Sequence, residues 1–190
     1  MTTSEPGTPR KVAFLVAAEG IERVELTEPW DALKDAGFEP VLVSPESGEV
    51  QTYDHLDKAA TMGVDETVAD ASVDSFDALV LPGGVANPDA LRTDEHAVTF
   101  TREFVASGKP VAAICHAPWT LVEAGVLKGR SLTSFPSLRT DITNAGGSWI
   151  DEKVVVDGNL ITSRNPGDLP AFISALLESL QHGAAAANVE

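Results

Sequence analysis

The sequence is poor in cysteine and in basic residues. A single cysteine, Cys115, occurs among the 190 residues, so an intrachain disulfide is excluded and a reducing compartment is the natural setting. Lys and Arg number 13 against 29 Asp and Glu, which gives a formal net charge of −16. Because binding to nucleic acids and to anionic lipids draws on cationic side chains, we expect no nucleic-acid partner and no membrane partner.

Long apolar segments are also missing. The first apolar run ends before Glu19, whereas a membrane helix needs about 20 apolar residues. The polar N-terminal residues lack the apolar core of a signal peptide. These absences predict a soluble, cytoplasmic protein.

What is present is typical of one globular domain. Apolar residues make up 43% of the chain and charged residues 22%, and a domain of this size buries enough surface to need no metal or disulfide. Residues 1–10 and 183–190 carry no apolar stripe, so we expect two flexible tails around a domain at 11–182.

Within that domain, short apolar runs alternate with helical patterns. The alternation predicts an α/β fold with a doubly wound, mostly parallel sheet and helices on both faces. Buried strands are predicted at 11–17, 38–44, 77–81 and 111–114, and a weaker one near 63–69, after a polar stretch at 45–60. Helices are predicted at 22–36, 94–107, 117–124, 138–144 and 168–180, and a hairpin at 154–162.

Three loops should meet at one edge of this sheet. The strands of a parallel sheet end on the same side, and ligands bind there. The loops that follow the predicted strands are 18–22, 82–89 and 115–118. We therefore place the candidate site at this edge.

Cys115 stands between a buried strand and a helix that opens with Pro118. This strand–turn–helix pattern is typical of a nucleophile elbow, with Ala113 and Ala117 where the hydrolase motif has glycines. A helix N-terminus lowers the pKa of a thiol, so we predict a pKa below the free value of about 8.5. The alternative is that Cys115 is a small buried apolar residue, as lone cysteines often are.

Other residues of the same edge could assist the sulfur. The amides of Gly83, Gly84 and His116 are candidate oxyanion donors, and the His116 ring is a candidate base. Glu22 is the candidate carboxyl group, which helps only if it is protonated, and Glu19 and Glu25 are its rivals by position. The remaining histidines, His55, His96 and His182, are interpreted as surface residues without metal-site spacing.

These motifs resemble the ThiJ/PfpI superfamily, in particular its PfpI-type intracellular protease and general stress protein branch. The resemblance spans about residues 11–180. It rests on KVAFLVA, on E-x-V-E-L from Glu22, on DALVLPGG, on GKPVAAICHAP, on L-x-G-R from Leu127, on TNAG from Thr143 and on VVVDGNLITSRNPGDLPAF. It implies a flavodoxin-like fold related to class I glutamine amidotransferase domains.

The resemblance also implies roles for individual residues. Cys115 would be the nucleophile, His116 its base and Glu22 the glutamate that hydrogen-bonds the sulfur. Asp89 is the nearest match to an acidic residue that reaches into a neighbouring subunit's site, although relatives have Glu there and a shorter loop. True amidotransferases carry a second histidine late in the chain. Ser163–Pro166 offers none, so we do not expect ammonia release from glutamine.

Three functions follow from this resemblance, in order of preference. The first is an enzyme of reactive carbonyls, a glutathione-independent glyoxalase or deglycase that uses no cofactor. The second is an intracellular cysteine peptidase. The third is a redox-sensing stress protein or chaperone with an oxidisable Cys115. The expected partners are a small carbonyl or peptide substrate and a second copy of the chain in a homodimer, or further copies in a higher homo-oligomer.

Overall fold

A seven-stranded sheet forms the centre of the computed structural model, which describes residues 10–187. The strand order is β11-β12-β8-β7-β1-β3-β6, and every neighbouring pair is parallel except β11 with β12. This confirms the predicted mostly parallel sheet. The strands are β1 (Lys11–Leu15), β3 (Glu39–Ser44), β6 (Glu66–Thr67), β7 (Ala78–Leu81), β8 (Val111–Ile114), β11 (Val154–Asp157) and β12 (Leu160–Ser163).

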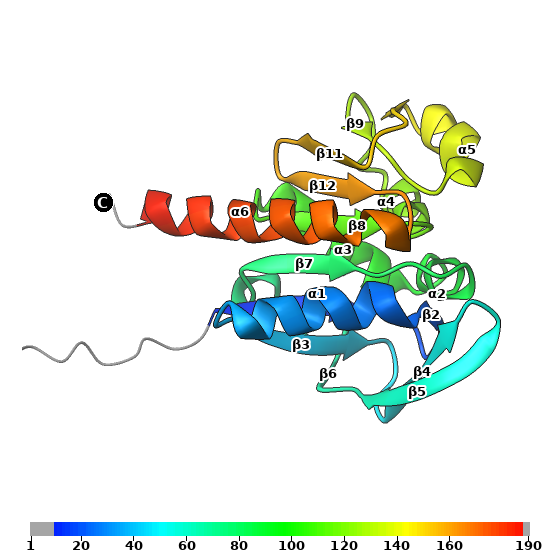
Figure 1. Cartoon of the computed structure of the whole chain (residues 1–190), viewed down its shortest axis with the longest axis vertical. Coiled ribbons are helices and arrows are strands. Elements are labelled where there is room, and N and C mark those ends of the chain that lie inside the picture. The colour runs from blue at the N-terminus through cyan, green and yellow to red at the C-terminus, as the bar shows by residue number, and fades with distance from the viewer. Residues whose placement is uncertain (1–9, 188–190) are drawn as a thin grey trace, which may run out of the picture.

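Helices cover both faces of the sheet (Figure 1). On one face lie α1 (Arg23–Asp35) and α6 (Leu169–Ala187), and on the other lie α3 (Glu95–Ala106) and α4 (Pro118–Ala124). Successive strand residues alternate between two cores, so Phe14 packs in the core of α1 and α6 while Leu15 packs in that of α3 and α4. Both cores consist mainly of apolar side chains, and they support the sheet beneath the site.

A small three-stranded sheet projects beyond the carboxyl edge of the main sheet (Figure 1). It consists of β2 (Glu19–Glu22), β4 (Glu49–Asp54) and β5 (Asp57–Gly63). The polar stretch at 45–60, where the sequence predicts no strand, contains β4 and the beginning of β5. The side chains of β5 do not alternate between buried and exposed positions. Its sequence therefore lacks the period of two by which a half-buried strand is predicted. A short helix, α2 (Ala86–Leu91), was also missed because six residues with an internal proline carry no helical stripe.

The remaining elements are short. They are β9 (Ser131–Leu132), β10 (Ser148–Trp149), α5 (Arg139–Asn144) and the 3₁₀ turns η1 (Val73–Ser75), η2 (Pro136–Leu138) and η3 (Pro166–Asp168). Among the described helices, none is both long and apolar enough to cross a lipid bilayer.

The predicted tails need two corrections. Arg10 is anchored, because its side chain bonds Asp77 Oδ1 at 3.1 Å and the carbonyl of Leu180 at 2.8 Å. Helix α6 continues to Ala187, so residues 183–187 are helical and not a tail. The rest of both predicted tails, residues 1–9 and 188–190, lies outside the described residues.

Candidate active site

Cys115 lies at a strained bend between β8 and α4. Its φ of 63° is in the left-handed region, which non-glycine residues rarely adopt. Two backbone hydrogen bonds hold the bend: Cys115 N–H donates to Ser163 O at 3.0 Å, and Phe135 N–H donates to Cys115 O at 2.8 Å. The predicted strand–turn–helix geometry is therefore present, and it leaves the cysteine 7% exposed.

The imidazole of His116 lies beside the sulfur. Its Nδ1 is 3.1 Å from Cys115 Sγ, and its Nε2 is 3.3 Å from Ser137 Oγ. The ring stacks on Phe135 with 4.5 Å between centroids and meets the edge of Trp119 at 5.4 Å. These contacts hold the ring in place, and burial lowers the pKa of His116, which keeps the imidazole neutral near neutral pH.

The carboxyl group at the sulfur belongs to Glu25 and not to Glu22, which corrects the sequence analysis. Glu25 lies in the first turn of α1 and is fully buried. Its Oε2 accepts the Gly83 N–H at 3.0 Å, and its Oε1 is buried without a hydrogen-bond partner. The signal that could have identified it is the buried stripe of Glu25, Pro29 and Leu33, four residues apart on one helix face.

Glu22 points elsewhere because it precedes the helix. It ends β2 and is the N-cap of α1, with extended backbone angles. Its Oε2 accepts the His55 N–H at 3.2 Å and lies 3.7 Å from His55 Nδ1. Glu22 and Glu19 both line the cavity described below, so they face the site without reaching the sulfur.

Gly83 and Gly84 permit a very close approach of three loops. A methyl group on Gly83 would lie 2.4 Å from Glu25 Oε2 and 2.6 Å from Cys115 Cβ, and one on Gly84 would lie 2.0 Å from Gly20 O. The Gly83 amide already bonds Glu25, so it is not free as an oxyanion donor and that prediction is wrong. The amides of Gly84 and His116 face the sulfur and remain the two candidate donors.

Asn87, which the sequence analysis missed, braces the same loops. It is fully buried in α2. Its Oδ1 accepts the Ala17 N–H at 2.7 Å, and its Nδ2 donates to the carbonyls of Pro82 and Gly83 at 2.9 and 3.0 Å. One side chain therefore ties the end of β1 to the glycine loop after β7.

A cavity of about 580 Å³ opens above the sulfur. The three predicted loops line it, which confirms that they meet at one edge. The β4–β5 hairpin adds Tyr53, His55 and Leu56, and Phe135 and Pro166 close the far side. Three glutamates and no lysine or arginine of the described chain line the cavity, so it favours neutral or cationic ligands.

Of the other predicted residues, Asp89 and His96 lie outside this cavity, whereas His55 lines it. Asp89 is exposed on α2 and lines a separate surface depression with Arg92 and Glu123. His96 is exposed on α3, and His55 is exposed at the hairpin turn. His182 belongs to α6, and its side chain lies outside the described part. Among the described side chains, no cluster of three His, Cys, Asp or Glu could hold a metal ion.

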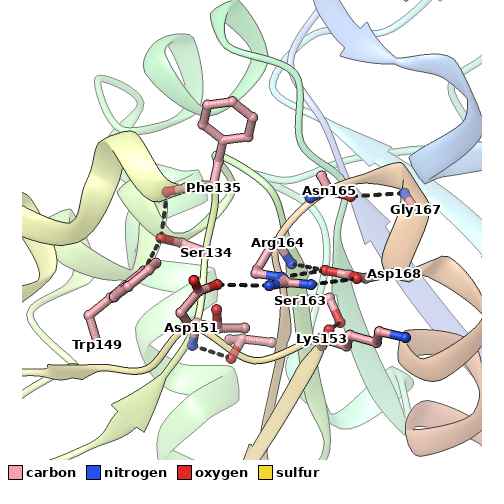
Figure 2. A network of polar contacts seen from close by, with 12 residues as sticks. Ser134, Phe135, Trp149, Asp151, Lys153, Ser163, Arg164, Asn165, Gly167 and Asp168 are labelled. Carbon is pink, nitrogen blue, oxygen red and sulfur yellow. Dashed lines mark hydrogen bonds and ion pairs between the residues drawn. The ribbon is translucent and has the colours of Figure 1, made fainter.

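The segment after β12 carries an ion-pair network (Figure 2). Arg164 pairs with Asp168 at 2.8 Å and with Asp151 at 2.7 Å, and Asn165 Oδ1 accepts the Gly167 N–H at 2.9 Å. This network fixes the loop that contains Pro166. It supplies no second histidine to the site, in agreement with the reading of Ser163–Pro166.

Burial controls the ionisation of the site. It raises the pKa of Glu25 to about 8, an effect to which the charge of Glu22 adds. Burial also raises the pKa of the Cys115 thiol, with a further contribution from the charge of Glu25, while the Gly84 and His116 amides lower it. The expectation of a thiol pKa below its ordinary value is therefore wrong, because desolvation outweighs the amides and the helix terminus.

Cys115 and Glu25 consequently titrate as a pair. Removal of one proton leaves a single negative charge on the pair. Removal of the second is opposed by both burial and repulsion. While Glu25 keeps its proton, its O–H group can donate a hydrogen bond to the sulfur, and the charge then lies on the thiolate beside the Gly84 and His116 amides.

Fold and site together define a class of α/β proteins with a buried cysteine at a strand-to-helix bend, flanked by a histidine and a carboxyl group. The DJ-1/PfpI family model matches residues 10–179, and the chain belongs to this family. The relatives include Deglycase PfpI of Pyrococcus furiosus, which is 47% identical over 90% of this chain and 99% of its own length. Protein/nucleic acid deglycase 2 of Escherichia coli is 44% identical over 86% of this chain and 93% of its own.

Solved structures show the same fold. Drosophila melanogaster DJ-1beta matches with a TM-score of 0.80 and 30% identity over 96% of this chain and 100% of its own. A two-domain protein of Anabaena variabilis, with DJ-1/ThiJ/PfpI-like and ferritin-like domains, matches with a TM-score of 0.86 and 40% identity. That match covers 93% of this chain and 49% of the longer one. These matches confirm the predicted flavodoxin-like α/β fold.

Proposed function

We propose that the protein is a cysteine-dependent, stress-protective enzyme that acts on reactive carbonyls and their amine adducts, as a deglycase or glutathione-independent glyoxalase. The observation that carries the proposal is the Cys115 Sγ, 3.1 Å from His116 Nδ1 and beside the buried Glu25, at the base of a 580 Å³ cavity. The deglycase names of relatives at 44–47% identity support it.

The proposed reaction needs no external oxidant. His116 Nδ1 takes the thiol proton, and the sulfur adds to the aldehyde carbon of a 2-oxoaldehyde to give a hemithioacetal. With an amine adduct, the sulfur displaces the amine, which leaves with a proton. A proton then moves from the former aldehyde carbon to the neighbouring keto carbon, which turns the bound unit into a 2-hydroxy thioester. Water releases the 2-hydroxy acid and restores the thiol.

Each group of the site has a place in these steps. The neutral His116 is suited to accept the first proton. Glu25, with a pKa of about 8, can as a carboxylate remove the proton from the former aldehyde carbon and, once protonated, return it to the neighbouring carbon. The Gly84 and His116 amides stabilise the oxyanion that forms during addition and hydrolysis. Because the reaction requires a free thiol, we propose that the protein works in the reducing cytoplasm.

A cysteine peptidase is the second candidate. A candidate cysteine protease of Bacillus subtilis, YraA, is 40% identical over 86% of this chain. Acyl transfer would use the same sulfur, histidine and oxyanion donors. The peptide bond would have to enter a cavity of about 580 Å³ that the β4–β5 hairpin helps to line, and a cavity of this size favours a small carbonyl over a long polypeptide.

The decisive experiment compares 2-hydroxy acid release from methylglyoxal and from methylglyoxal-treated N-acetylarginine with hydrolysis of a fluorogenic peptide library. We expect turnover of the carbonyl substrates, none of it in Cys115→Ser, and a loss of roughly 10²–10⁴-fold in His116→Ala. His96→Ala, at the exposed histidine of α3, is the matched control and should keep full activity.

Peptide hydrolysis without carbonyl turnover would establish the peptidase instead. Absence of both activities in a folded protein, with Cys115 oxidised by peroxide, would favour the redox-sensing alternative. Full carbonyl turnover by Cys115→Ser would exclude the cysteine mechanism.

A further inference from the structure

The His116 ring has one polar partner at each nitrogen. Nδ1 lies 3.1 Å from Cys115 Sγ, and Nε2 lies 3.3 Å from Ser137 Oγ. Within the described part of the chain, no carboxylate bonds either nitrogen. Within the chain, the polar partner of Nε2 is therefore a neutral hydroxyl group.

The turn that carries Ser137 is fixed to the cysteine bend. Ser137 belongs to η2, which follows directly on Phe135, and Phe135 N–H donates to the carbonyl of Cys115 at 2.8 Å. Behind it, Trp149 Nε1 donates to Ser134 Oγ at 2.9 Å, and Ser134 Oγ donates to the Phe135 carbonyl at 2.8 Å (Figure 2). The position of Ser137 relative to His116 is thus set by the same backbone that positions the sulfur.

A neutral imidazole carries one proton, and its location decides whether the ring can act as a base. To accept a proton from Cys115, Nδ1 must present its lone pair, so the proton must be on Nε2. That N–H group requires an acceptor, since an unpaired buried donor costs about 1–3 kcal/mol. The hydroxyl oxygen of Ser137 is the acceptor that the structure offers.

We propose that Ser137 is a positioning residue that holds His116 in the Nε2–H tautomer, with Nδ1 directed at the thiol. This inference rests on the proposed function for its catalytic consequence, but not for the tautomer itself. A serine orients the ring without a charge, unlike a carboxylate, which would stabilise the imidazolium and raise the pKa of His116. With a serine at position 137, His116 therefore stays available as a neutral base.

The direct test is NMR of the imidazole nitrogens in the resting protein, which is tractable because the chain has four histidines. We expect the Nε2–H tautomer for His116 in the wild type and a mixture of tautomers in Ser137→Ala. Ser148→Ala, at an exposed serine of β10, is the matched control and should leave the spectrum unchanged. An Nδ1–H tautomer in the wild type, or no change in Ser137→Ala, would overturn the proposal.

Kinetics give the second test. Ser137→Ala should lower kcat about 10-fold or more with little change in KM, as a part of the roughly 10²–10⁴-fold contribution of a general base. Ser137→Thr should restore the rate, because it returns the hydroxyl group. Ser137→Asp should move the acidic limb of the pH–rate profile to higher pH by raising the pKa of His116. An unchanged kcat in Ser137→Ala, or an unshifted limb in Ser137→Asp, contradicts the assignment.

The two proposals can fail separately. If NMR shows the expected tautomer and its dependence on Ser137 but no carbonyl substrate is turned over, the positioning role stands and the proposed function is wrong. If carbonyl turnover is found but the tautomer does not depend on Ser137, only the positioning role is wrong.

Discussion

Glu25 and Cys115 come from distant parts of the chain and lie on either side of Gly83. A methyl group on Gly83 would be 2.4 Å from Glu25 Oε2 and 2.6 Å from Cys115 Cβ. The Gly83 amide donates to the same carboxyl oxygen at 3.0 Å. A glycine that leaves space for both side chains thus brings a carboxyl group and a thiol together in a buried site, where burial raises the pKa of both and the charge of Glu25 raises that of Cys115 further.

Gly83→Ala should disrupt this arrangement. The added Cβ would also lie 2.8 Å from the backbone oxygen of Ile114, which cannot move without shifting β8. We expect a loss of roughly 1–3 kcal/mol in the free energy of unfolding, the usual range for overpacking, together with loss of carbonyl turnover. Urea unfolding measures the first quantity. Gly63→Ala, where a Cβ meets nothing within 4 Å, is the control, and equal effects of both variants would contradict the steric account.

Glu25 should make the protein less stable as the pH rises from about 4.5 to about 8. The folded carboxyl has its pKa raised from 4.5 to about 8, so over this interval the folded state holds a proton that the unfolded state has lost. The contribution is complete below the unfolded pKa and is lost as the pH passes the folded pKa. Each unit of pKa difference corresponds to about 1.4 kcal/mol.

The measurement is urea unfolding of the wild type and Glu25→Gln across this interval. The difference between their unfolding free energies should shift steadily in favour of the variant as the pH rises. Glu28→Gln, at an exposed glutamate of the same helix, should run parallel to the wild type. Parallel curves for Glu25→Gln as well would show that Glu25 does not carry the raised pKa.

The reactivity of the thiol should depend on Glu22, although Glu22 does not touch the sulfur. The charge of Glu22 contributes to the raised pKa of Glu25, so Glu22→Gln should let the Cys115–Glu25 pair lose its first proton at a lower pH. Alkylation by iodoacetamide reports on Cys115 alone, because the chain has one cysteine. We expect the midpoint of the wild-type rate to lie above the pH at which a free thiol ionises, because burial and the charge of Glu25 raise the pKa of Cys115, and we expect this midpoint to move in Glu22→Gln but not in Glu28→Gln. A midpoint unmoved in Glu22→Gln would rule out this coupling.

The chain should form a homodimer in solution. Asp89 is exposed on α2 and lies away from the cavity of its own chain, so it could reach a cysteine site only in another subunit. Light scattering at micromolar concentration should give twice the monomer mass, and Asp89→Asn should lower turnover without altering the fold. A monomer at that concentration would remove any role for Asp89 in a neighbouring site.

Much of the fold follows from local patterns. The strands β1, β7 and β8 are buried on both faces, so their sequences are continuous apolar segments. The start of α3 is likewise local, because Asp94 caps this helix by accepting the Ala97 N–H at 2.8 Å. The position of Cys115 in a sharp turn also follows from the sequence, because an apolar strand ends directly before it and a helix begins at Pro118, three residues after it. The convergence of three loops needed no more than the rule that parallel strands end at one edge.

The identity of the carboxyl group was decided by tertiary structure. The three candidates are all glutamates, so residue type does not distinguish Glu19, Glu22 and Glu25. The residue at which β2 ends and α1 begins determines which of them faces inward. A change of one residue in a helix start rotates each side chain by about 100°, and sequence patterns do not locate helix starts that closely. Glu22 also pairs with the β4–β5 hairpin, which the sequence does not predict, and this pairing directs Glu22 away from the sulfur.

The ionisation of the Cys115 thiol and the hydrogen bonds that orient the site could not be predicted from the sequence either. Helix placement alone suggests a thiol with a low pKa, but packing buries Cys115 and sets Glu25 beside it, and desolvation reverses the direction of the shift. The contact of Ser137 with His116 and that of Asn87 with Ala17 join residues remote in the chain, and such contacts leave no periodic pattern in the sequence. The sequence by itself therefore determined the sheet, its carboxyl edge and the cysteine at the bend. Three-dimensional packing decided which polar groups surround the sulfur, because side-chain direction and burial depend on contacts between elements far apart along the chain.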